Sequence, residues 1–185
     1  MDKRKHNTTT MKDFASLTLK RRSIRKYTEQ TINPEDVQLL LQAGLVAPTS
    51  KNKKPCHFIA VEAKEKLKQL AACKKGGCGF IADSAVSIVV GADPLVSNVW
   101  IEDASIAATF IQLQAEDLGL GSCWVQVRGR QTADGFDSEE YVRSVINAPM
   151  QLQILAIITI GYKKDEKTPQ DPDSLGWENV HIDSF

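Results

Sequence analysis

Long apolar runs are missing from this 185-residue sequence, and so is an excess of charge of either sign. No stretch of about 18 consecutive apolar residues occurs, which argues against a transmembrane helix. The 23 Lys and Arg residues balance 23 Asp and Glu residues, so no global field steers the chain onto nucleic acid or a membrane. Residues 1–12 lack the apolar stretch of a secretory signal, and we expect a flexible tail on a cytoplasmic protein.

Cysteine is scarce as well, and the absence of an export signal predicts reduced thiols. The four cysteines are Cys56, Cys73, Cys78 and Cys123, with no C-x-x-C pair. With only three histidines, ligands are too few for a metal site, and none is expected. A regulatory disulfide between Cys73 and Cys78, which have glycines around them, stays open.

The usual catalytic patterns are also absent. No Ser-His-Asp arrangement, paired carboxylates or P-loop stands out in the sequence. A chain without a clear nucleophile or acid–base pair, but with a basic cluster suited to phosphate and with glycine turns, is typical of an enzyme whose cofactor performs the chemistry. We therefore assign no catalytic side chain.

Helices and strands are mixed along the chain, which predicts an α+β fold. No repeat or linker interrupts residues 13–185, so we expect one domain there. The expected strands cover residues 57–61, 86–90, 123–127 and 155–160. The expected helices cover residues 14–19, 34–47, 63–72, 101–118 and 138–146. In the second of these, Asn33 should cap the start, and Val37, Leu40, Leu41 and Leu45 should point inward.

The expected helix 101–118 is apolar on two faces. One face carries Ala104, Ala107, Ala108, Ile111, Ala115 and Leu118. The other carries Ile106, Phe110 and Leu113. Because such a helix cannot face water, it lies either at the centre of the domain or at a subunit interface. Glu102 and Asp103 are interpreted as acidic charges at its positive N-terminal end.

Three segments could bind a ligand, although each also has an ordinary structural explanation. The basic segment 20–26 offers Arg21, Arg22, Ser23 and Arg25 to a phosphate, unless it is a solvated surface run. The polar loop 47–55 could contact a ring edge or be a turn. The glycines at 119 and 121 could let backbone approach a flat ligand or could end the helix. Their helix-then-strand order excludes a Rossmann fingerprint.

Together these segments resemble the nitroreductase family of flavoproteins. The resemblance rests on residues 21–25, 47–52, 100–105 with 118–124, and 161–162 with 177–181. It extends over residues 14–185, nearly the whole chain. It implies a nitroreductase-like α+β fold with a central, mostly antiparallel sheet flanked by helices, and an intertwined homodimer with FMN at the interface.

The resemblance also implies how the cofactor would be held. The phosphate and pyrimidine side would meet Arg21, Arg22, Ser23 and Arg25. The other subunit would supply Pro48, Thr49, Ser50 and Asn52. The ring would be lined by Cys123, Trp124, Val125 and Gln126, with a backbone N–H near the flavin N5. The tail after Gly161 would wrap the partner.

The implied activity is an FMN-dependent oxidoreductase with a ping-pong hydride mechanism. NADH or NADPH would reduce the flavin at N5, and a small acceptor such as a nitroaromatic or quinone would take the electrons. Three features depart from the family pattern. Cys56 stands where many members have Trp, and no basic residue occurs in 168–173, which leaves Lys163, Lys164 or Lys167 for the phosphate. The glycine-rich stretch 76–79 also lacks the amide side chain that some members supply.

Three alternatives remain at this point. One is a specialised reductase for a halogenated aromatic or an enone, although such branches add a lid for which 185 residues leave little room. The second is a dimeric FMN-binding module without nicotinamide-driven turnover. The third is a thiol redox sensor that uses Cys73 and Cys78.

Overall fold

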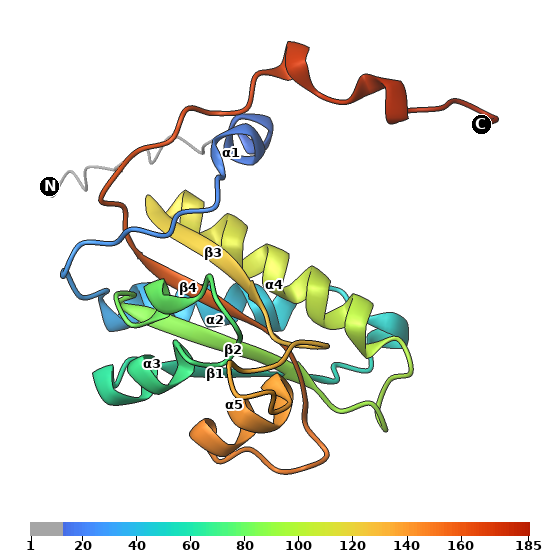
Figure 1. Cartoon of the computed structure of the whole chain (residues 1–185). Helices are drawn as coiled ribbons and strands as arrows, with labels where there is room; N and C mark the ends of the chain where they lie inside the picture. Colours follow the sequence, from blue (N-terminus) through green and yellow to red (C-terminus); the bar gives the residue numbers. More distant parts are fainter. Residues whose placement is uncertain (1–12) are drawn as a thin grey trace, which may run out of the picture.

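A four-stranded antiparallel sheet forms the centre of the protein (Figure 1). The computed structural model describes residues 13–185, so the expected tail of residues 1–12 lies outside the described residues. The strands are β1 (Cys56–Val61), β2 (Val86–Ala92), β3 (Leu120–Gln126) and β4 (Gln153–Tyr162), in the order β1-β2-β4-β3. The sheet and its flanking helices confirm the predicted α+β class and all four strands.

Five helices surround the sheet, and all five were expected. They are α1 (Phe14–Lys20), α2 (Pro34–Val46), α3 (Lys64–Leu70), α4 (Trp100–Asp117) and α5 (Ser138–Ile146). Asp13 and Asp137 cap the starts of α1 and α5 by accepting backbone hydrogen bonds. Asn33 does not cap α2 with its side chain, so that expectation is wrong; Pro34 in the first turn marks the start instead.

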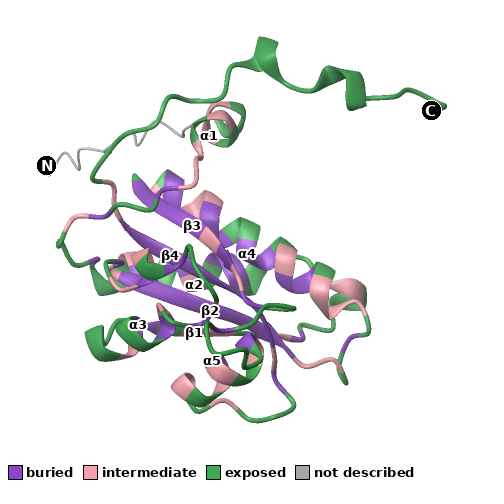
Figure 2. Ribbon diagram, in the orientation of Figure 1, coloured by how far each residue is buried: buried purple, intermediate pink, exposed green. Residues whose placement is uncertain are grey.

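Helices cover both faces of the sheet, which explains why β2 and β4 are apolar without a polar face. Ile88 and Val90 pack with α2 and α4, whereas Val89 between them packs with α3 and α5. Because successive strand residues point to opposite faces, a strand covered on both sides needs an unbroken apolar run. Figure 2 shows the sheet as the buried centre of the molecule.

The second apolar face of α4 is not covered within the chain. Ile106 is 39% exposed and Phe110 is 38% exposed, whereas Ala104 and Ile111 on the other face are fully buried. The centre-of-domain interpretation of this helix is therefore wrong, because one of its apolar faces is open. An apolar groove of about 380 Å³ lies beside this face, between α1, α2 and α4.

The end of α2 adds to the open apolar surface. Leu45 was expected to point inward but is 62% exposed, and Val46 is 64% exposed. Leu45 follows Leu40 by five residues, which places it about 140° away around a helix of 3.6 residues per turn. Ala43 and Gly44, three and four residues after Leu40, take the inward positions instead.

The chain leaves the sheet after β4 and runs past α1, away from the rest of the molecule (Figure 1). Two contacts hold the first part of this tail near α1. The Gln170 amide donates to the Leu19 carbonyl, and the Arg22 guanidinium donates to the Thr168 carbonyl. Every residue from 164 to 185 is exposed, including Trp177 and Ile182.

Candidate functional site

The basic segment crosses the ends of β3 and β4, where backbone hydrogen bonds fix it. The Ile24 amide donates to the Ser122 carbonyl at 2.9 Å, and the Thr28 amide donates to the Tyr162 carbonyl at 2.9 Å. Ile24 is 3% exposed and anchors the segment between its basic neighbours. The sequence therefore alternates apolar anchors with cations that stay at the surface.

Two glycines make room for these anchors. A Cβ atom at Gly121 would lie 2.7 Å from Ile24 Cγ2, and one at Gly161 would lie 2.9 Å from Tyr27 Cδ1. The Tyr27 hydroxyl donates to the Ile24 carbonyl at 2.6 Å, which ties the two anchors together. Gly119, with φ of 78°, follows the C-cap residue of α4, Leu118, in the left-handed conformation typical of a helix end. Gly119 thus has the role of a helix end, whereas Gly121 makes room for Ile24, and the approach of this backbone to a flat ligand stays a prediction.

Lys26 of this segment pairs with Asp165 at 3.0 Å, whereas the three arginines are not neutralised by nearby carboxylates. None of the ion pairs found within residues 13–185 involves Arg21, Arg22 or Arg25. The Arg25 guanidinium lies 5.8 Å from the centre of the Phe80 ring. The Lys167 Nζ donates to the Ser23 carbonyl at 2.8 Å, which adds a fourth cation from the tail. This concentration of cations, whose side-chain hydrogen bonds within residues 13–185 go to carbonyl groups and not to carboxylates, suits an anion such as a phosphate.

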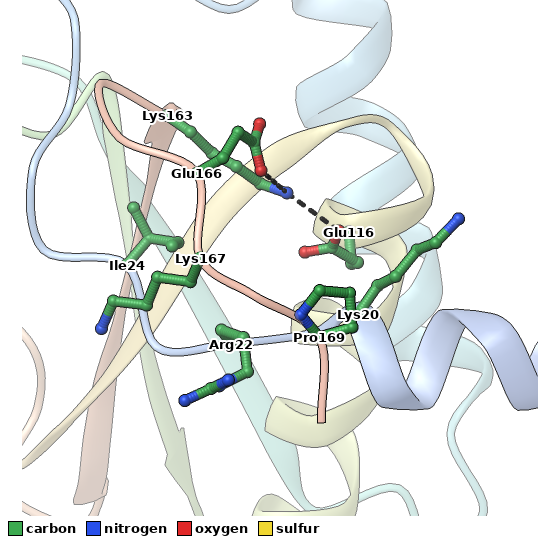
Figure 3. Close-up of a pocket in the computed structure, with 8 residues that line it drawn as sticks. All are labelled: Lys20, Arg22, Ile24, Glu116, Lys163, Glu166, Lys167 and Pro169. Carbon is green, nitrogen blue, oxygen red and sulfur yellow. Dashed lines mark hydrogen bonds and ion pairs between the residues drawn. The ribbon is translucent and has the colours of Figure 1, made fainter. Parts of the chain in front are cut away.

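A cavity of about 300 Å³ opens beside this cluster (Figure 3). Its lining includes Arg22 from the basic segment and both Lys163 and Lys167 from the chain that follows β4. Lys163 forms a nearly buried ion pair with Glu116 at 2.8 Å and a second contact with Glu166 at 3.7 Å. Because Lys163 already faces two carboxylates, Lys167 is the better placed of these two for an anionic ligand. A larger hollow of about 890 Å³ on the other side of the segment is lined by Arg25, Lys26 and Lys164, among others.

The residues expected to line the ring lie on β3 and point to both faces of the sheet. Cys123 and Val125 are each 1% exposed, whereas Trp124 and Gln126 are half-buried and joined by a 3.0 Å hydrogen bond from Nε1 to Oε1. Burial raises the pKa of the Cys123 thiol, and the charge of Arg25 opposes that rise, which places the thiol behind the basic segment. Lining of a ring by all four side chains stays a prediction.

The backbone of β3 offers a more direct contact, because β3 pairs with β4 on one side and is an edge strand among the described residues. The Ser122 carbonyl already accepts from Ile24 and therefore points away from β4. In an antiparallel pair, residues two apart turn their backbone groups to the same side. The N–H groups of Trp124 and Gln126 accordingly point to the open edge.

The second predicted segment, residues 47–55, contains a tight loop at 48–54 with an unusual backbone. Lys51, Asn52 and Lys54 have φ values of 51°, 55° and 49°, a region that disfavours residues other than glycine by about 1 kcal/mol each. The Thr49 Oγ1 accepts from the Lys54 amide at 3.0 Å. Pro48 and Asn52 are exposed, and Thr49 and Ser50 are half-buried. The loop presents a compact polar surface that needs an external anchor.

Asp103 is that anchor, which the sequence interpretation missed. Its Oδ1 accepts from the Ser50 amide at 2.7 Å, and its Oδ2 accepts from the Ser97 hydroxyl at 2.9 Å. The residue is 2% exposed, so it is more than a charge at the start of a helix. The missed signal was its spacing: Asp103 precedes Ala107 and Ile111 at four-residue intervals on the buried face of α4.

The two predicted binding segments lie at opposite ends of α4 (Figure 1). Asp103 holds the loop at the first turn, whereas Glu116 meets Lys163 beside the basic segment at the last turn. Thirteen residues at 1.5 Å per residue separate these positions by roughly 20 Å. The structure therefore places the basic segment and the start of β3 together at the C-terminal end of α4. It does not bring the 48–54 loop of the same chain to them.

Comparison with known proteins gives the family context. The family model of the nitroreductase family matches residues 18–77 and 70–162. A protein of Archaeoglobus fulgidus, provisionally named NADH dehydrogenase/NAD(P)H nitroreductase, is 33% identical over 161 residues, which span 85% of this chain and 89% of that protein.

Solved structures agree with this family context. An FMN-dependent nitroreductase from Clostridium difficile is 43% identical, with a TM-score of 0.90 over 92% of this chain and 99% of that one. A nitroreductase from Desulfovibrio desulfuricans, solved in complex with FMN, is 26% identical, with a TM-score of 0.73 over 92% of this chain and 96% of that one.

The described part of the chain lacks both a membrane-spanning helix and a cluster of metal ligands. Within residues 13–185, no helix has the length and apolar character to cross a bilayer. Over the same residues, no three side chains of His, Cys, Asp or Glu come together in a group suited to a metal ion.

Proposed function

The chain belongs to the nitroreductase family, and on this premise we propose that it is a homodimeric, FMN-dependent oxidoreductase that passes electrons from NADH or NADPH to a small acceptor. Family membership and the names of its relatives support the FMN cofactor and the NAD(P)H donor. The observation that carries the homodimer is the separation of the two binding segments along α4.

The residues at the basic end fit the cofactor. A phosphate monoester carries close to two negative charges at neutral pH and three acceptor oxygens. Arg21, Arg22 and Arg25 form no ion pair within residues 13–185, and Lys167 donates only to a carbonyl there. Their backbone is held by Ile24, so the donors are ordered before the ligand arrives. Such preorganised, charge-assisted donors are the chemistry that a phosphate site needs.

A second copy of the chain completes the site. In a two-fold dimer whose α4 helices run antiparallel, the 48–54 loop of one chain reaches the basic segment of the other, and the symmetry makes two equal sites. The open face of α4, with Ile106 and Phe110, and the neighbouring Leu45 and Val46 supply an apolar surface for this contact. An exposed apolar surface of this kind is typical of an interaction site.

The tail supports the same arrangement. Residues 164–185 contribute almost nothing to the core of their own chain, although Trp177, Val180 and Ile182 are apolar. Wrapped around a partner, these side chains leave water, which is favourable in proportion to the apolar area covered. The tail thus stabilises the dimer rather than the single chain, and its contact with the partner makes the dimer intertwined.

The chemistry at this site needs little from the side chains. When bound, FMN supplies the hydride and electron exchange with NAD(P)H and acceptor. The cations Arg21, Arg22 and Arg25 hold the phosphate, and the open edge of β3 presents the Trp124 and Gln126 N–H groups to the ring edge. With FMN bound, donor and acceptor would occupy the same open site in turn, which is a ping-pong order, and no side chain would be needed as an obligatory acid.

The acceptor is a small planar molecule such as a nitroaromatic or a quinone. No helix or long insertion within residues 13–185 covers the edge of β3 as a lid would, and this supports an open site with a loose substrate range. All four cysteines are free thiols, which supports a reducing compartment such as the cytoplasm.

The visible spectrum of the purified protein tests this function. We expect a yellow protein whose flavin bands bleach when NADH or NADPH is added without oxygen and return when a quinone follows. A protein that stays yellow with both nicotinamides would contradict turnover and favour an FMN-binding module. A colourless protein that also ignores added FMN would contradict the cofactor itself.

A further inference from the structure

We propose that Leu95 is a specificity-determining residue, which contacts the apolar face of the acceptor and selects acceptors with a large aromatic body over compact polar ones. The inference rests on the proposed function, because it places Leu95 beside the flavin that the partner chain holds. It is carried by the turn that presents Leu95 and by the contacts that join this turn to the 48–54 loop.

The turn between β2 and α4 holds Leu95 in a fixed, outward position. Leu95 is 88% exposed, whereas Ser97, two residues later, is 1% exposed. The Val96 amide donates to the Asp93 carbonyl at 3.1 Å, and the Leu95 amide donates to the Asp93 Oδ1 at 2.8 Å. Pro94 occupies the second position of this four-residue turn, where its fixed φ suits the backbone. Because Leu95 is already held at the tip, little freedom is lost when a ligand contacts it.

Two sets of hydrogen bonds place this turn beside the loop that precedes β1. The buried Asp103 carboxylate accepts from the Ser97 hydroxyl at 2.9 Å and from the Ser50 amide at 2.7 Å, so one side chain anchors both segments. The Asp93 amide donates to the Pro55 carbonyl at 3.0 Å, which joins the segments a second time. The two segments lie side by side because they adjoin the paired ends of β1 and β2.

This placement brings Leu95 to the acceptor. In the proposed dimer, the 48–54 loop of one chain reaches the FMN that the other chain holds, and Leu95 is joined to this loop. A planar acceptor that stacks on the flavin with one face leaves its other face to water. Leu95 covers that second face, and the contact removes apolar surface from water, which is favourable in proportion to its area. An acceptor with a large apolar face is therefore bound more tightly than a compact polar one.

The charge of the neighbouring loop defines the rest of the acceptor. Lys51, Lys53 and Lys54 are exposed, and none of the ion pairs found within residues 13–185 involves them. Ammonium groups attract the electron-rich oxygens of a quinone or a nitro group. The acceptor that suits this site thus combines an apolar face for Leu95 with an oxygen-bearing edge for the lysines.

The test measures steady-state turnover of the FMN-loaded dimer with saturating NADH or NADPH and two acceptors. Menadione is a naphthoquinone with a large apolar face, and ferricyanide is a compact anion without one. In Leu95→Ala, the KM for menadione should rise about tenfold, because truncation removes much of the apolar contact. The KM for ferricyanide and the affinity for FMN should stay unchanged. Leu95→Met, which keeps the apolar volume, should keep the KM for menadione within about twofold.

Met150→Ala is the matched control, since Met150 is 85% exposed but lies in a different loop, between α5 and β4. An unchanged KM for menadione in Leu95→Ala would overturn the inference, and so would an equal rise in Met150→Ala or for ferricyanide. A Leu95→Ala protein that becomes monomeric in gel filtration would overturn it as well, because Leu95 would then be an interface contact.

The failure of this inference differs from the failure of the proposed function. An unsubstituted protein that binds no FMN, or whose flavin neither nicotinamide reduces, would overturn the proposed function and this inference with it. An unsubstituted protein that turns over menadione, with no change in Leu95→Ala, would overturn the inference alone.

Discussion

The two ends of α4 hold their binding segments by different physical means. At the C-terminal end, two backbone hydrogen bonds hold the basic segment, and Ile24 and Tyr27 also pack into the space that Gly121 and Gly161 leave open. At the N-terminal end, the 48–54 loop is fixed by hydrogen bonds to one buried carboxylate, Asp103, and its backbone is locally unfavourable.

This difference predicts different sensitivities. A segment that is held by packing tolerates changes in the charge of its exposed side chains but not in the volume of its buried ones. Its cations are therefore not needed to hold the segment and are available to bind a ligand. A loop held by one carboxylate tolerates changes in its exposed side chains but collapses when the carboxylate is lost. The basic end should therefore decide affinity for the cofactor, and the loop end should depend on its anchor.

The largest effect is expected at the basic end. Replacing Arg21 and Arg25 by Ala removes two charge-assisted contacts of about 2 kcal/mol each, so FMN should bind about 1,000-fold more weakly. Fluorescence titration of the apoprotein with FMN measures this change. The matched control, Lys66→Ala with Lys68→Ala, removes the same charge from α3 and should change affinity little. Unchanged FMN retention in the arginine variant would reject the site assignment.

At the loop end, Asp103→Ala should lower the free energy of unfolding by about 3 kcal/mol, because the Ser50 amide and the Ser97 hydroxyl lose their acceptors. It should also raise the dissociation constant for FMN about tenfold through the displaced loop. Urea denaturation and flavin titration measure the two effects. Glu102→Ala, the exposed neighbour, is the control; equal behaviour of the two variants would show that Asp103 is not the anchor.

Gly121→Ala sharpens the comparison at the packed end. The added Cβ would lie 2.7 Å from Ile24, so the free energy of unfolding should fall by about 2 kcal/mol through overpacking. Thermal unfolding followed by circular dichroism gives the measurement. Gly79→Ala meets no atom within 4 Å and serves as the matched control. Full stability of Gly121→Ala would mean that packing does not position the basic segment.

The smallest effect is expected for Lys51→Gly in the loop. Glycine removes the left-handed strain at φ of 51°, but it also increases the freedom of the unfolded chain, so the free energy of unfolding should change by less than about 0.5 kcal/mol. The same urea titration applies. A loss near 2 kcal/mol would show that the loop is held by the Lys51 side chain rather than by Asp103.

The fold was largely predictable, and the division of the site was not. The β-branched run at 86–90 and the helical spacing around Ala104 and Ile111 identified their elements correctly. The exposure of Leu45 and the loop contact of Asp103 were not predicted. The spacing of apolar residues in a helix does not show where neighbouring elements end or which loop packs against the helix. The contact of Ile24 with Gly121 joins residues nearly a hundred positions apart, so local sequence patterns cannot predict it.

A mixed dimer tests the shared site most directly. One chain carries Arg21→Ala and Arg25→Ala, the other carries Ser50→Ala and Asn52→Ala, and two different affinity tags isolate the heterodimer. We predict that each parent homodimer has both sites damaged and retains little FMN. The heterodimer should bind one FMN per dimer, because the intact ends of both chains meet at one of its two sites. A heterodimer that binds no more FMN than its parents would contradict a site divided between two chains.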